Sequence, residues 1–145
     1  MTENEIGTVI VETAIDLHRH LGPGLLESVY EMVLAYELSA QGLAVQRQAP
    51  ISIVYKTITF AEAFRADLLV ADKVIVELKS VEQINNAHRK QIQTYLRLTN
   101  LKLGYLLNFG AALMKEGIVR AVNGLEETSP YPVTRAETRR RREEI

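Results

Sequence analysis

Two apolar, strand-like segments in the middle of the chain carry three charged side chains, and these are its best candidates for chemistry. The segments meet at a three-residue polar loop between Val70 and Val74, which predicts a tight hairpin. Pairing Val70 with Val74 places Asp67 directly opposite Glu77, at about 5 Å. Lys79 then shares the face of Glu77, because side chains alternate along a strand.

Two carboxylates held this close share either a proton or a cation. An acid pair with an adjacent amine is a ligand set for a hard divalent cation. One interpretation is therefore that Asp67, Glu77 and the carbonyl of Leu78 bind Mg²⁺ or Mn²⁺. Lys79 would then orient or deprotonate the attacking water, or offset charge on a phosphate. The alternative is a set of solvated ion pairs with Arg65, which would contribute little stability.

Glu27 is a further acidic candidate, in the first turn of a predicted helix. Tyr30 and Leu34 lie three and seven residues later, so Glu27 shares a largely apolar face and is expected to point inward. A purely structural alternative remains, because acids favour helix N-termini through the macrodipole.

A later predicted helix carries His88, Gln91 and Tyr95 on one stripe, by spacings of three and four residues. Gln91 could hydrogen-bond a nucleophilic water or a phosphate, with Tyr95 beside it. The alternative is that these are hydrogen-bonded polar positions at the edge of a core.

The elements that must position these residues alternate between helices and strands. The order predicts an α/β sandwich with a mixed sheet and helices on its faces, and the link from 81 to 102 suits a crossover between parallel strands. Helices are expected at 6–21, 25–41 (with Gly42 as C-cap) and 86–98, the last capped by Asn85 or Asn86. Strands are expected at 43–48, 51–55, 57–60, 64–70, 74–81, 102–109 and 117–122.

Composition excludes several classes of protein. The 145 residues, 47% hydrophobic and 24% charged, suit one domain at 1–125 followed by a charged tail at 126–145. The absence of cysteine excludes disulfides and a cysteine nucleophile, and the histidine spacing disfavours zinc. Neither a signal peptide nor a membrane-length apolar run is present, so a cytoplasmic protein with no membrane partner is expected.

Charge leaves a nucleic-acid partner open. The formal net charge of −1 neither suggests nor excludes one, since local patches decide. The basic residues that could meet phosphates are scattered, and such residues more often serve solvation. They are Arg19, Arg47, Lys56, Arg65, Arg89, Lys90, Arg97 and the tail arginines Arg139–Arg142.

Several of these motifs, in this order, resemble one known family. The resemblance covers roughly residues 6–122, and the pattern is that of the GxxExxY proteins. Its motifs are Gly24-x-x-Glu27-x-x-Tyr30, Arg65-Ala-Asp67, Val76-Glu77-Leu78-Lys79, Gln91-x-x-x-Tyr95 and the segment from Leu103 to Asn108-Phe109-Gly110.

That family is similar to the PD-(D/E)XK nuclease superfamily, and the resemblance implies a restriction-endonuclease-like αβββαβ sandwich with a central mixed sheet. By this resemblance Asp67, Glu77 and Lys79 take the catalytic positions. Glu27 fits the acid of the first core helix, which can complete metal binding. Gln91 and Tyr95 fit a Gln-x-x-x-Tyr motif, and the Arg-rich tail inherits no role.

The function implied is an Mg²⁺- or Mn²⁺-dependent nuclease that hydrolyses phosphodiester bonds, in DNA rather than RNA. The alternative is a non-catalytic module that keeps the nuclease fold for binding or assembly. A basic rim around the acids would favour the enzyme. An apolar or self-complementary rim would favour the module or a homo-oligomer.

Overall fold

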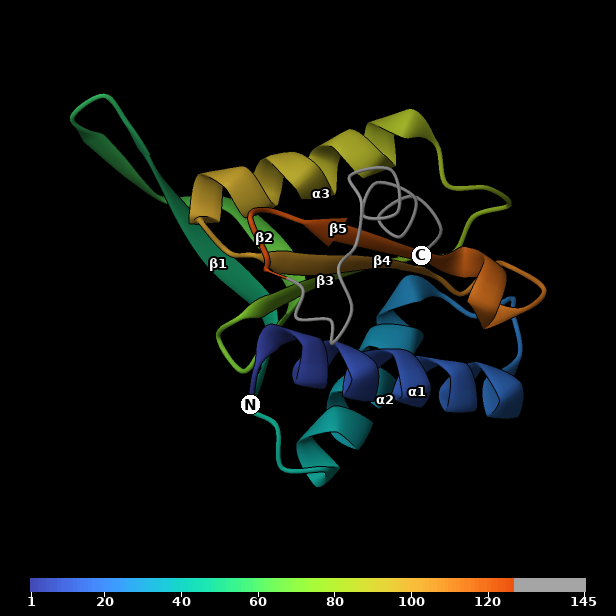
Figure 1. Ribbon diagram of the computed structural model, residues 1–145. Coiled ribbons are helices and arrows are strands. Elements are labelled where there is room, and N and C mark those ends of the chain that lie inside the picture. The colour runs from blue at the N-terminus through green and yellow to red at the C-terminus, as the bar shows by residue number, and fades with distance from the viewer. Residues whose placement is uncertain (127–145) are drawn as a thin grey trace.

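A five-stranded sheet forms the centre of the computed structural model, which describes residues 1–126. The strand order is β1-β2-β3-β4-β5; only the β3–β4 pair is parallel. Helices α1 and α2 cover one face and α3 the other (Figure 1). The elements are α1 (Glu3–Leu21), α2 (Glu27–Ala40), β1 (Val45–Tyr55), β2 (Ile58–Val70), β3 (Val74–Lys79), α3 (Asn86–Thr99), β4 (Leu103–Asn108), the 3₁₀ helix η1 (Met114–Gly117) and β5 (Ile118–Val122).

This architecture confirms the predicted α/β sandwich with a mixed sheet. The crossover from β3 through α3 to β4 makes the parallel pair, as expected from its length. Among the described residues, no helix is long and apolar enough to cross a membrane. The predicted charged tail, apart from its first residue, lies outside the described residues.

Apolar residues on each face of the sheet form a separate core. In β3, Val74, Val76 and Leu78 pack against α1 and α2, whereas Ile75 packs against Ile92 and Leu96 of α3. Five of the six β3 residues are buried, as expected for a central strand covered on both faces. Glu77, a charged residue type, is therefore held in an apolar strand.

Two predicted strand boundaries were wrong. The segments 43–48 and 51–55 form the single strand β1, and 57–60 and 64–70 form the single strand β2. Pro50 does not interrupt β1, because an edge strand has no outer neighbour that requires its missing N–H. The register shifts once, between Ile51 and Ile53. This β-bulge coincides with the gap between residues 60 and 64 that separated two predicted strands.

The predicted hairpin register between β2 and β3 is confirmed. Val70 pairs with Val74, and Lys73 N donates to Val70 O at 3.0 Å. Ala71 and Asp72 turn the chain with φ angles of 53° and 56°. This turn sets which residues of the two strands lie opposite each other.

The segment that follows β3 is held in place by residues at the end of β4. The buried Asn108 side chain accepts hydrogen bonds from Val81 N and Gly110 N, each at 3.0 Å, and donates to Val81 O at 2.9 Å. Phe109 N donates to Lys79 O at 2.8 Å. A Cβ on Gly110 would overlap the backbone of Val81. The chain after Lys79 is therefore held in one position.

Replacing Gly110 by alanine should lower the free energy of unfolding by about 1–3 kcal/mol, because the new methyl group meets rigid backbone at Val81. Urea denaturation measures the change. Ala112→Ser, two residues along and exposed, serves as the control and should change stability by less than about 0.5 kcal/mol. Equal stability of Gly110→Ala and wild type would contradict the close packing.

Candidate functional site

Asp67 and Glu77 lie together where β2 and β3 separate. The backbone ladder runs from Val70↔Val74 to Leu68↔Val76, and these two acids come next in register. Asp67 N donates to Glu77 Oε1 at 3.3 Å, and Leu78 N donates to Asp67 Oδ2 at 2.9 Å. Each carboxylate thus accepts a backbone N–H from the opposite strand. The structure brings the two predicted acids together.

The environment of Glu77 opposes its ionisation. Its side chain is only 6% exposed. Burial first, and then the neighbouring charge of Asp67, raise the pKa of Glu77 to about 9, and Lys79 offsets this only in part. In the metal-free protein Glu77 is therefore protonated at neutral pH. Two carboxyl groups in such close contact share one proton unless a cation takes the place of that proton.

Lys79 is half-buried and follows Glu77 by two residues on β3. Within residues 1–126 no ion pair joins Lys79 to Glu77 within 4 Å. The alternative of solvated ion pairs also required Arg65 to pair with the acids, but Arg65 pairs with Glu62 at 3.4 Å. The acids therefore lack the ion pairs that a purely structural arrangement would have required.

A cavity of about 200 Å³ opens between Asp67 and α2. Buried Glu31 accepts hydrogen bonds there from Arg47 at 3.1 Å and from Gln48 Nε2 at 2.5 Å. Gln48 Nε2 also lies 3.3 Å from Asp67 Oδ1. The lining residues are Glu27, Ser28, Glu31, Gln48, Asp67 and Leu78. A polar network thus connects α2 to Asp67.

Gln48 adopts a left-handed backbone conformation inside β1, with φ at 50°. It lies between the register pairs Arg47↔Leu68 and Ala49↔Ala66, so it stands beside Asp67 across the strands. This conformation costs a residue other than glycine about 1–2 kcal/mol. Such strain concentrates at functional sites. Here the strained residue is one whose side chain bonds both Glu31 and Asp67.

Glu27 lies at this cavity but does not point into the core. It is exposed, and its Oε1 accepts a hydrogen bond from Ser80 N at 3.2 Å. The expected inward orientation is wrong, because α2 begins at Glu27 and the buried face is taken by Tyr30 and Leu34. In residues 1–126, no three His, Asp or Glu side chains form a group that could hold a metal. A ligand role for Glu27 stays a prediction.

Helix α3 brings Gln91 and Tyr95 to the acids. Tyr95 stacks on Phe64 with ring centroids 3.8 Å apart. Burial and then the charges of Glu77 and Asp67 raise the pKa of Tyr95, and a hydrogen bond with Gln91 lowers it. Tyr95 is thus a neighbour of the acid pair, and Gln91 is a neighbour of Tyr95. The Gln91 side chain is exposed to solvent.

Two candidates have structural roles. The Tyr30 ring is fully buried against Phe109, with centroids 4.3 Å apart, and its hydroxyl bonds Gly22 O and Leu25 N. It therefore anchors the loop between α1 and α2. His88 completes a capping box with Asn85, accepting from Asn85 N at 3.2 Å.

Glu31 and Gln48 were not among the site residues expected from the sequence. A signal existed for Glu31, because it follows Glu27 by four residues and so lies on the same side of the helix. Gln48 had no signal, since a positive φ at glutamine is not visible in a sequence. Arg47, one of the basic residues that could meet phosphates, pairs with Glu31 at 3.1 Å, and a phosphate contact for it stays a prediction.

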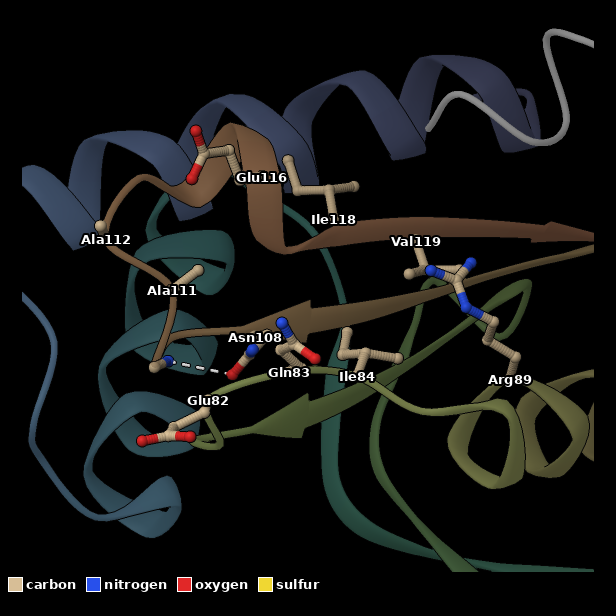
Figure 2. Close-up of a pocket in the computed structure, with 11 residues that line it drawn as sticks. Glu82, Gln83, Ile84, Arg89, Asn108, Ala111, Ala112, Glu116, Ile118 and Val119 are labelled. Carbon is tan, nitrogen blue, oxygen red and sulfur yellow. Dashed lines mark hydrogen bonds between the residues drawn. The ribbon is translucent and has the colours of Figure 1, made fainter.

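A cavity of about 500 Å³ lies apart from the acid pair. Figure 2 shows it beside the start of α3, with Arg89 and Val119 on one side and Glu82 and Ala111 on the other. Asn108 lies between them, bonded to Gly110. This hollow abuts the segment that follows Lys79, at the carboxyl ends of β3 and β4, where open α/β sheets bind ligands.

The mixed sheet with helices on both faces, and an acid pair at the point where β2 and β3 diverge, define a nuclease-like α/β domain. The chain belongs to the PD-(D/E)XK nuclease superfamily, whose model matches residues 4–121. Searches of curated proteins and of solved structures found no significant match. Membership implies nucleic-acid binding and, for the superfamily in general, the use of divalent metals.

The protonation of Glu77 predicts how stability changes with pH in EDTA. The folded protein keeps this proton up to about pH 9, whereas the unfolded chain releases it near pH 4.5. The stabilisation that protonated Glu77 gives to the folded state is therefore complete below pH 4.5 and is lost as pH rises toward 9. The unfolding free energy should fall by up to about 1.4 kcal/mol per pH unit across this window.

Replacing Glu77 by glutamine should remove that slope, because glutamine does not titrate. Urea denaturation at several pH values measures it. Glu82→Gln, at an exposed acid, should keep the slope of the wild type. Parallel curves for wild type and Glu77→Gln would contradict the raised pKa.

Proposed function

We propose that this protein is an Mg²⁺- or Mn²⁺-dependent nuclease that hydrolyses phosphodiester bonds, with DNA as its substrate rather than RNA. One observation carries the proposal. Asp67 and Glu77 lie opposite each other on two strands. Glu77 Oε1 accepts from Asp67 N at 3.3 Å and Asp67 Oδ2 accepts from Leu78 N at 2.9 Å, with Lys79 two residues beyond Glu77. Superfamily membership supports the same chemistry.

The donor set fits a hard divalent cation. Carboxylate and carbonyl oxygens are the ligands that Mg²⁺ prefers, and Asp67, Glu77 and the carbonyl of Leu78 supply them. Without a metal, Glu77 keeps a proton beside Asp67, and such an ion would take the place of that proton. When bound, the metal would polarise the phosphate and lower the pKa of a bound water. These three residues would hold it, and Gln48 would keep Asp67 in place.

The remaining residues act on the substrate. Lys79 carries a positive charge beside the acids, where it would orient the attacking water or offset charge that develops on the phosphate. Gln91 is exposed on α3 and would hydrogen-bond the same water or a phosphate oxygen. Tyr95, fixed by its stack on Phe64, would hold Gln91 in position.

Cleavage of labelled single- and double-stranded DNA and RNA in Mn²⁺ or Mg²⁺ tests the proposal. The wild type should cleave DNA, and EDTA should abolish the reaction. Lys79→Ala should lose activity by at least about 100-fold, because charge stabilisation in the transition state is lost. Lys102→Ala, at an exposed lysine away from the acids, should retain activity. Full activity of Lys79→Ala would contradict the mechanism.

A second candidate is a nuclease-fold module that binds without turnover. It is favoured by the absence, within residues 1–126, of any group of three acidic or histidine side chains that could hold a metal. Calorimetry with Mn²⁺ separates the two. Binding that is lost in Asp67→Asn, together with cleavage, supports the enzyme. No cleavage and no Mn²⁺ binding would favour the module.

A further inference from the structure

The β1–β2 hairpin projects from the body of the molecule as an arm, defined here as residues 52–63 (Figure 1). Every residue from 54 to 63 is exposed, so neither layer of helices covers it. The inner parts of the same strands are covered by α2 and α3. The arm is therefore available to another molecule.

One face of the arm is apolar. The register pairs Ile53 with Phe60 and Tyr55 with Ile58, so these four side chains share a face. Three of them are markedly exposed: Tyr55 at 59%, Ile58 at 56% and Phe60 at 47%. The arm thus presents a contiguous set of large apolar side chains to solvent, which marks an interaction surface.

This face continues the core beneath α3. Ile51 and Phe64, the next pair toward the body, pack in that core. Beyond them the arm is hollowed by a groove of about 470 Å³, lined by Ile53, Tyr55, Phe60, Ala61, Glu62 and Ala63. Helix α3 ends at Thr99 and leaves this extension uncovered. A large apolar side chain fits such a groove.

The charge of the arm argues against nucleic acid as its occupant. The arm carries one cation, Lys56, and one anion, Glu62. Lys56 Nζ lies 5.5 Å from the Tyr55 ring centroid, and Glu62 pairs with Arg65. Binding to phosphates requires several cations. A neutral apolar face instead fits an apolar protein surface, and a neutral patch can meet a copy of itself without repulsion.

We infer that the arm is a self-association surface, in which two copies of this chain pack their arm faces about a two-fold axis. Such an axis places the same patch on both partners. Tyr55 or Phe60 of one copy fills the groove of the other. The inference does not depend on nuclease activity.

The exposed apolar area of the arm is small, so we expect a weak dimer. The exposed part of these side chains amounts to roughly 300–400 Å². A standard stable interface buries about 800 Å² on each partner. The arm alone therefore supports a dimer that dissociates in the micromolar range and is visible only at raised protein concentration.

Sedimentation velocity of the full chain, from about 1 to 500 µM, tests the inference. The wild type should pass from monomer to dimer. The double variant Tyr55→Lys/Phe60→Lys should raise the dissociation constant at least about tenfold. The control Val54→Lys/Thr59→Lys adds the same charge to the opposite face of the arm and should change it by less than about threefold.

Hydrogen exchange of the wild type at low and high concentration locates the contact without any substitution. Protection that rises with concentration in residues 52–63 supports the inference. A wild type that stays monomeric throughout would overturn it, as would equal weakening by both double variants. Protection elsewhere, such as on α2, would also overturn it by placing the contact on another surface.

Discussion

The structure depends on one exchange of hydrogen bonds, at the point where β2 and β3 part. Beyond Leu68↔Val76 the two strands bond through side chains, because Glu77 accepts from Asp67 N and Asp67 accepts from Leu78 N. Buried backbone N–H groups need partners, and here carboxylates provide them. The fold is thereby obliged to keep two acids in contact, one of them buried (Glu77) and the other half-buried (Asp67). The proton that Glu77 retains offsets the repulsion between the two acids, and a cation would take its place.

The rest of the molecule holds this pair from three sides. On the α2 side, Gln48 connects Glu31 to Asp67 from a strained backbone conformation. On the β4 side, Asn108 fixes the chain that follows Lys79. Helix α3 adds Tyr95, which is stacked on Phe64 and close to both acids. Elements on three sides of the acid pair therefore restrain the site.

The centre of the site could be predicted from sequence because local rules determine it. A hairpin turn sets the register, the register sets Asp67 opposite Glu77, and alternation sets Lys79. The mixed sheet followed equally from the length of the crossover. The supports could not be predicted, because they depend on tertiary packing. The left-handed Gln48, the Glu31 network and the exposed position of Glu27 arise only when α2 packs against β1 and β3. Continuity of β1 through Pro50 likewise required knowing that it is an edge strand.

The most direct test of the central claim is a crystal structure grown in Mn²⁺, with anomalous diffraction measured to locate the ion. The account predicts one strong peak bonded to the carboxylates of Asp67 and Glu77 and to the carbonyl of Leu78, and no such peak in Asp67→Asn. An ordered wild-type site with no peak between the two acids, or with manganese bound only elsewhere, would contradict the claim that this acid pair is a metal site.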